Sequence, residues 1–165
     1  MTGARVGWPS PKFPAFPAAS VPLPAGWTPF VQGGAVFGAH HVVGSGGFNA
    51  NVLITVERWP IAATAEQSLE VLRARIGQVK GREQRVETGL TEPDGVYLEA
   101  VQREPRLGEL LVVYRTAVVP HDGITDVLTA VGTASVLQVK AIGDDLRAMV
   151  RGLELMPPDE AERDA

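Results

Sequence analysis

The sequence predicts one α+β domain, in which an antiparallel sheet of about six strands is flanked by two amphipathic helices. Two segments, near residues 64–81 and 135–156, carry apolar residues at spacings of three and four, which is typical of helices with one buried face. Shorter segments between turn residues are typical of strands. With 165 residues, 45% of them hydrophobic and 21% charged, the chain has the size and composition of a single globular domain.

The domain is expected to be preceded by a leader and followed by a tail. Residues 1–19 are rich in proline, and we expect them to form an extended, loosely held leader. The structured domain is predicted to span residues 20–156, with a polar tail at 157–165. It is expected to open with a short strand and a turn at residues 20–27, followed by a second strand at 36–43.

The next strand is predicted at residues 51–57, where Val52, Ile54 and Val56 form one strongly apolar face. A loop is expected before it at residues 44–48, because three glycines within four residues make regular structure costly.

The first helix is predicted to begin after Thr64, because Gln67 three residues later completes a capping box. Gly81 is expected to end this helix. The apolar stripe consists of Leu69, Leu72, Ile76 and Val79.

Four further strands are predicted after this helix, at residues 85–90, 95–103, 107–119 and about 125–134. The turns between them contain Pro93-Asp94-Gly95 and Glu104-Pro105-Arg106. Because these connections are short, neighbouring strands are expected to be antiparallel.

The second helix is predicted to begin after Ser135, which forms a second capping box with Gln138. Pro157 and Pro158 are expected to end it. Its buried face is expected to consist of Val139, Ile142, Leu146, Met149, Val150 and Leu153.

Composition excludes several classes of function. The chain has no cysteine, which excludes disulfides, thiolate catalysis and cysteine-ligated metal centres. Its 15 basic residues are outnumbered by 19 acidic ones, which argues against a nucleic-acid partner. No segment approaches 20 consecutive apolar residues, so no membrane span is predicted. The first residues lack the apolar run of a signal peptide, so the chain as written is expected to be cytoplasmic.

No catalytic motif is found in the glycine-rich loop. Gly44-Ser45-Gly46 is not a nucleophile elbow, because Val43 stands where that motif needs a glycine. A dinucleotide-binding loop would need a third glycine where Asn49 stands, and a phosphate-binding loop would need a Gly-Lys-Ser/Thr ending. We therefore predict no catalytic residue and no cofactor.

The histidines do not predict a metal site. His40 and His41 are consecutive, so on a strand their side chains point to opposite faces and cannot bind one metal together. Asp144 and Asp145 are expected to face solvent on the second helix. Glu99 is expected on a strand, facing either solvent or a pocket. An enzyme that uses His40 or His41 with Glu99 remains an alternative.

Aromatic side chains give the best candidates for binding. Trp27, Phe30, Phe48 and Trp59 are expected at strand ends or in loops, with Asn49 beside Phe48. Such residues contact a protein partner or a small apolar ligand in many binding sites. The alternative is that they close the open end of the sheet.

Three stretches resemble the LpqN-type proteins of actinobacteria. They are Val21-Pro-Leu-Pro-Ala-Gly-Trp27, Asn49-Ala-Asn-Val-Leu-Ile-Thr-Val56, and the long hairpin that contains Tyr97 and Tyr114. The resemblance covers about residues 20–156. It implies the fold shared by the photosystem PsbP proteins and the Ran-binding Mog proteins, in which helices flank a sheet.

The resemblance also implies a function. Members of this fold group are mostly non-enzymatic binding or accessory proteins, and some relatives are chaperones for secreted effectors. We therefore expect a non-catalytic binding or accessory module, with a chaperone or assembly subunit as the alternative. LpqN-type proteins are typically envelope lipoproteins, and this chain has no lipid-accepting cysteine. Envelope association is expected only if the chain is a piece of a longer protein.

Overall fold

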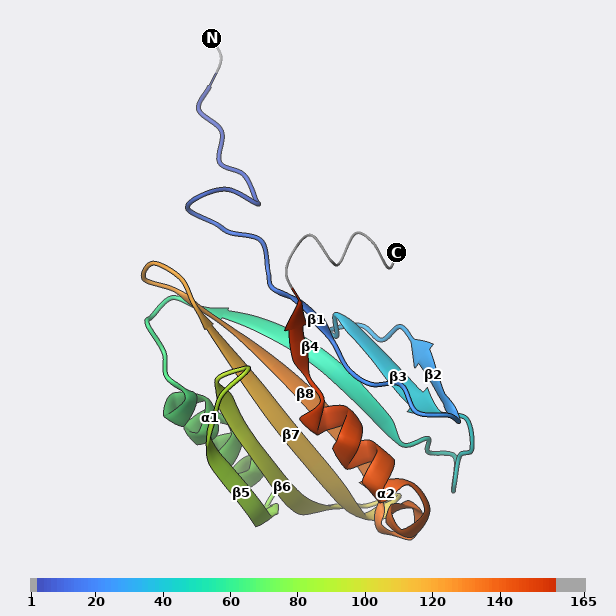
Figure 1. Cartoon of the computed structure of the whole chain (residues 1–165). Helices are drawn as coiled ribbons and strands as arrows, with labels where there is room; N and C mark the ends of the chain where they lie inside the picture. The colour runs from blue at the N-terminus through green and yellow to red at the C-terminus, as the bar shows by residue number, and fades with distance from the viewer. Residues whose placement is uncertain (1–2, 157–165) are drawn as a thin grey trace.

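The computed structural model describes residues 3–156, which form a seven-stranded sheet, a two-stranded sheet and two helices (Figure 1). All neighbouring strands of the large sheet are antiparallel, in the order β2-β3-β4-β8-β7-β6-β5. Its strands are β2 (Trp27–Phe30), β3 (Phe37–His41), β4 (Asn51–Trp59), β5 (Arg82–Leu90), β6 (Gly95–Glu104), β7 (Gly108–Pro120) and β8 (Thr125–Ser135). The predicted α+β class is confirmed, with seven strands in the main sheet.

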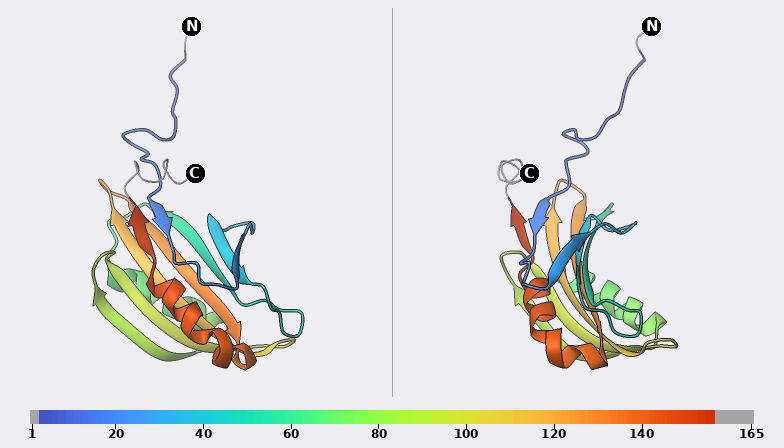
Figure 2. Two further views of the ribbon diagram at one scale, coloured as in Figure 1. Left: turned by 45° about the vertical axis from the view of Figure 1, so that its right-hand side comes forward. Right: turned by 90° about the vertical axis from the view of Figure 1, so that its right-hand side faces the viewer.

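The two helices, α1 (Ala65–Gln78) and α2 (Val136–Arg151), cover opposite faces of the curved sheet (Figure 2). Successive side chains on a strand point to opposite faces of the sheet, so the core has one part under each helix. On β6, Leu98 packs in the part under α1, whereas Tyr97 packs in the part under α2. The fold is therefore a helix–sheet–helix sandwich with two apolar layers. Neither described helix is long and apolar enough to cross a membrane.

The capping box predicted for α1 is present. Thr64 Oγ1 accepts a hydrogen bond from the Gln67 N–H at 3.3 Å, and Gln67 Oε1 accepts one from the Thr64 N–H at 2.9 Å. Leu69, Leu72 and Ile76 are buried as predicted. Val79 is 48% exposed, because the helix ends at Gln78, before this position of the stripe.

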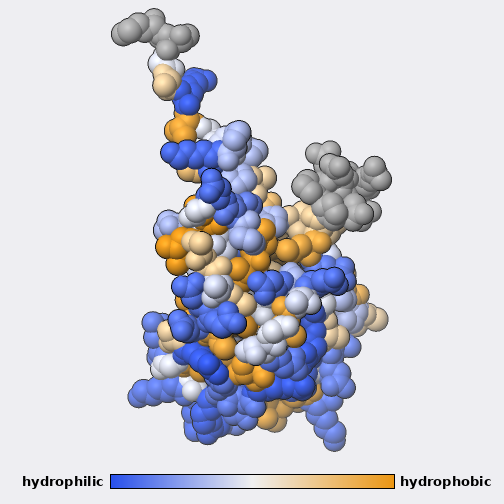
Figure 3. Space-filling view, turned by 60° about the vertical axis from the view of Figure 1, so that its left-hand side comes forward, coloured by the Kyte–Doolittle hydropathy of each residue, from blue (hydrophilic) through white to orange (hydrophobic). Residues whose placement is uncertain are grey.

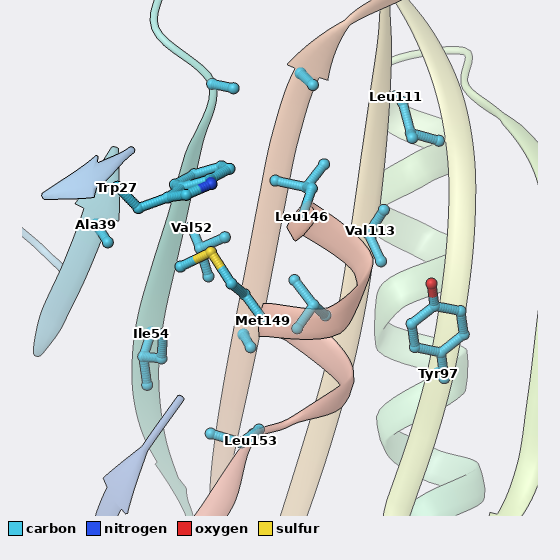
Figure 4. Close-up of a cluster of buried hydrophobic side chains, with 14 of the residues drawn as sticks. Trp27, Ala39, Val52, Ile54, Tyr97, Leu111, Val113, Leu146, Met149 and Leu153 are labelled. Carbon is cyan, nitrogen blue, oxygen red and sulfur yellow. The ribbon is translucent and has the colours of Figure 1, made fainter. Parts of the chain in front are cut away.

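Helix α2 begins at the predicted place, where Gln138 Oε1 accepts a hydrogen bond from the Ser135 N–H at 2.9 Å. Its apolar face packs on β8, β7 and β4 over the cluster that Figure 4 shows. The buried residues of this cluster that come from α2 are Ile142, Leu146, Met149 and Val150.

The predicted end of α2 is wrong. The helix ends at Arg151 with Gly152 as its C-cap, and the chain then forms β9 (Glu154–Met156). Gly152 lies so close to the extended segment before β2 that an added Cβ would be 2.5 Å from Pro22 Cδ. The helix therefore ends at a tertiary contact rather than at Pro157, which lies with the predicted tail outside the described residues.

The predicted leader is partly built into the fold. Its last two residues belong to β1 (Ala18–Ser20), which pairs with β9 in the two-stranded sheet, with Ala18 opposite Met156. Upstream, Arg58 Nη2 donates a hydrogen bond to the Pro14 carbonyl oxygen at 2.8 Å, and the Arg58 guanidinium lies 4.5 Å from the centre of the Phe16 ring. The domain therefore begins before residue 20.

Candidate functional site

Trp27, one of the predicted contact residues, belongs to the core. Its side chain is only 5% exposed and lies beneath α2, among Val52, Ile54 and Met149 (Figure 4). Trp27 lies opposite His41 on β3, and Ala39, two residues before His41, belongs to the same buried cluster as Trp27 and α2. Trp27 is therefore not accessible to a ligand or a partner, contrary to the sequence-based prediction.

Phe48 and Asn49 hold the loop before β4 in place. The half-buried Phe48 packs against the α1-side core, and its carbonyl oxygen accepts a hydrogen bond from Gln138 Nε2 at 3.0 Å. Asn49 Nδ2 donates a hydrogen bond to the His41 carbonyl oxygen at 2.7 Å. These contacts show a structural role for both residues, and a role in binding remains a prediction.

Trp59 lies at the other end of β4, where its Nε1 donates a hydrogen bond to Glu57 Oε2 at 3.1 Å. At about 3.3 Å per residue, the length of β4 separates Trp59 from Phe48 by roughly 30 Å. Phe48, Trp59 and the buried Trp27 therefore do not form one surface.

The alternative pair of a histidine and Glu99 is not assembled. As predicted, the consecutive histidines face opposite sides of the sheet. The His41 ring contacts the Trp27 ring edge-on, with 5.4 Å between the ring centres, and the His40 ring contacts the Phe30 ring, with 5.1 Å between the centres. Glu99 lies on β6, and strands β4, β8 and β7 separate it from β3. At about 4.8 Å per strand, this separation approaches 20 Å, which is too far for proton transfer between the two side chains.

Glu99 is instead the centre of a buried polar network. It is 5% exposed, and the Tyr97 hydroxyl donates a hydrogen bond to Glu99 Oε2 at 2.7 Å. Arg147, on α2, donates to Glu99 Oε1 through Nε at 3.1 Å. Burial raises the pKa of Glu99, but the hydrogen bonds from Arg147 and Tyr97 outweigh it and lower this pKa below its ordinary value.

A second network surrounds Asp126, which is completely buried on β8. Arg58 Nε and Nη2 donate hydrogen bonds to the two carboxylate oxygens at 2.7 and 2.8 Å, and His121 Nε2 lies 2.8 Å from Oδ2. Burial raises the pKa of Asp126, but these hydrogen bonds and the Arg58 charge outweigh it and lower the pKa. Because Arg58 also binds the Pro14 carbonyl oxygen, this network fastens the leader to the sheet.

An apolar hollow lies at the β2–β3 end of the sheet. It has a volume of about 380 Å³, within the range of small-molecule sites. We call this surface the apolar groove. It is lined by Val21, Leu23, Pro29, Phe30, Val31, Val36, Phe37, Gly38 and Ala39, none of which is charged or polar.

The walls of the apolar groove come from two parts of the chain. Leu23 belongs to the segment that crosses from β1 to β2, and Val31 and Val36 flank the turn between β2 and β3. These three side chains are 51%, 97% and 62% exposed, respectively. Figure 3 brings forward the side of the molecule that carries α1 and β5 in Figure 1, where apolar patches lie between hydrophilic residues.

Sequence reasoning missed the apolar groove, although Phe30 was among the candidate aromatic residues. Val31 and Val36 flank Gly33-Gly34, and apolar residues at the tip of a hairpin were the available signal. The other wall could not be predicted, because nothing in the spacing shows that Leu23 lies beside this hairpin.

Comparison with known proteins supports the fold. No protein-family model matches the chain, and no curated protein matches it either. The crystal structure of LpqN, involved in cell envelope biogenesis of Mycobacterium tuberculosis, aligns with a TM-score of 0.67 at 16% identity, over 87% of this chain and 86% of LpqN. The chain has the LpqN fold.

A second similar structure is the solution structure of cyanobacterial PsbP (CyanoP) from Synechocystis sp. PCC 6803. It aligns with a TM-score of 0.48 at 12% identity, over 94% of this chain and 99% of that protein. The alignment with LpqN confirms, at the level of fold, the resemblance to LpqN that the sequence predicted.

Proposed function

We propose that this chain is a non-catalytic binding or accessory module that takes up an apolar group in the apolar groove. The observation that carries the proposal is the concentration of exposed aliphatic side chains in one hollow without a charged neighbour. Large apolar side chains exposed together on a soluble protein mark sites of ligand or partner contact more often than isolated ones do. The apolar group belongs to a small ligand or to a side chain of a partner protein.

The likeness to LpqN supports the broader part of the proposal. LpqN is involved in cell envelope biogenesis, and we propose an accessory role in the same process for this chain. Because one fold serves many functions, this part rests on analogy, whereas the binding site rests on the geometry of the apolar groove.

The binding proposal is tested with Nile red, an uncharged apolar dye whose fluorescence rises in an apolar environment. We expect saturable binding to the unmodified protein. Val36→Asp places a charge on the wall of the groove and is expected to weaken binding at least about tenfold, because the dye cannot compensate a desolvated carboxylate. Val36 is exposed, so the substitution is expected to leave the fold intact.

Val42→Asp is the matched control, since Val42 is 56% exposed, similar to Val36, but lies outside the apolar groove. It is expected to bind Nile red as the unmodified protein does. The absence of saturable binding, or an equal loss in both variants, would show that the groove is not the site.

A further inference from the structure

A second hollow lies on the α2 face of the sheet, against β5, β6 and β7 and therefore away from the apolar groove. It has a volume of about 440 Å³. The side chains of Val101, Leu111 and Val139 give it an apolar lining, and Lys140 and Arg147 of α2 add two positive charges. We call this surface the basic hollow.

Arg147 is held in a fixed position in the basic hollow. Its Nε and Nη2 lie 3.1 and 3.0 Å from Glu99 Oε1, while Glu99 Oε2 accepts a hydrogen bond from the Tyr97 hydroxyl. Both oxygens of this buried carboxylate are therefore occupied. A guanidinium whose partner is fixed in this way presents its remaining N–H groups in a defined direction.

Part of the Arg147 guanidinium remains available. Among the described residues, the one carboxylate oxygen within ion-pair distance of its Nη1 is Asp144 Oδ1, at 3.9 Å. The Asp144 side chain is fully exposed, as predicted. The Arg147 side chain itself is 32% exposed. A ligand in the hollow can therefore replace a weak, solvated contact without breaking the bond to Glu99.

Lys140 adds a second cation, which forms no ion pair within residues 3–156. The lining of the hollow carries these two cations and one carboxylate, Glu99, whose oxygens are already bonded; the solvent-exposed Asp144 lies outside the lining. The lining thus combines net positive charge with apolar walls.

We propose that the basic hollow binds a small amphipathic anion, that is, a carboxylate or sulfonate on an apolar body. The anionic group would bind Arg147 and Lys140, and the body would cover Val101, Leu111 and Val139. The Glu99–Arg147 pair positions Arg147 for this contact, because hydrogen bonds hold both oxygens of Glu99 in place. This inference does not depend on the function proposed for the apolar groove.

The test is an amide NMR titration with phenylbutyrate, compared with phenylbutanol, which has the same body without the charge. We expect saturable shifts at the amides around Val101, Leu111 and Val139, and binding of the alcohol at least about tenfold weaker. Binding of the acid should also weaken as salt is raised from roughly 0.05 to 0.5 M, because the cations lie near the surface. Equal affinity for acid and alcohol, or shifts confined to other elements, would overturn the proposal.

Lys140→Met removes one cation without touching the buried network. It is expected to weaken phenylbutyrate binding about tenfold, the loss of one charge-assisted contact. Lys80→Met is the matched control, since Lys80 is an exposed lysine at the end of α1. Unchanged binding in Lys140→Met, or an equal loss in Lys80→Met, would exclude the site. Nile red binding should be unchanged in both variants, so that this proposal and the proposed function fail separately.

Discussion

At the scale of single residues, the hydroxyl group of Tyr97 supports the buried polar network around Glu99. The ring is fully buried, and the hydroxyl satisfies one oxygen of the buried Glu99 carboxylate. Burial, together with Glu99, raises the pKa of Tyr97, so the hydroxyl keeps its proton and remains a donor at all moderate pH values. Arg151 lies over the same ring, 3.7 Å from its centre.

Tyr97→Phe is therefore expected to lower the free energy of unfolding by about 1–3 kcal/mol, because it leaves one oxygen of a buried carboxylate without its donor. Urea denaturation measures this loss. Tyr114→Phe is the control, because the Tyr114 hydroxyl makes no hydrogen bond within the described residues. It should change stability by less than about 0.5 kcal/mol. Equal losses would show that the hydrogen bond to Glu99 is not responsible.

At the scale of secondary-structure elements, the edges of the sheet are poorly suited to accept a further strand. β2 has Pro29 in its interior, which lacks an N–H, and β5 is interrupted by two register shifts. β5 also carries four charged residues, Arg82, Glu83, Arg85 and Glu87. These features protect edges from pairing, so they do not support a chaperone that captures its partner by strand addition.

The junction between α2 and β9 depends on one glycine. Gly152→Ala is expected to lower the free energy of unfolding by roughly 1–3 kcal/mol, because the new Cβ would overlap the rigid Pro22 ring. Gly77→Ala is the matched control: it lies inside α1 with nothing within 4 Å of an added Cβ, and should stabilise the protein by about 0.5–1 kcal/mol. Thermal unfolding of both variants measures the difference, and a stabilised Gly152→Ala protein would contradict the packing described.

The elements that local sequence determines were predicted well. The beginnings of α1 and α2 follow from Thr64 with Gln67 and from Ser135 with Gln138, and all of these residues lie where expected. The end of α2 and the β1–β9 sheet could not be predicted, because they depend on Gly152 meeting a segment 130 residues earlier in the sequence. The same applies to the sites: Glu99 and Arg147 pair across 48 residues, a separation at which spacing carries no information.

At the scale of the whole molecule, stability is expected to depend on ionised carboxyl groups. Five carboxyl groups among residues 3–156 have a pKa below the ordinary value, because hydrogen bonds and charges from neighbouring side chains outweigh the effect of burial; these neighbours are mainly arginines, with Trp59 contributing most at Glu57. The five groups are Glu57, Glu83, Glu87, Glu99 and Asp126. A carboxyl group with a lowered pKa stabilises the fold above its unfolded pKa, near 4, and this stabilisation is lost as pH falls through the folded value.

The unmodified protein should therefore lose stability as the pH is lowered below about 4. Asp126→Asn removes one of these groups, so the variant should be less stable at neutral pH, and its deficit should shrink on acidification. Urea midpoints measured for both proteins at neutral pH and at several acidic pH values check this expectation. A deficit that stays constant with pH would show that ionised Asp126 does not stabilise the fold through Arg58 and His121.

The pairing of β1 with β9 also determines how the molecule responds to mechanical force. Ala18 lies opposite Met156 and Ser20 opposite Glu154, so the chain enters β1 and leaves β9 at the same end of this small sheet. Tension that pulls Ala18 and Met156 apart would break the three residue pairs one after another, as when a hairpin is opened from its end. It would not shear the three pairs at the same time. This sheet should therefore open at low force, while the long antiparallel ladder between β7 and β8 remains intact.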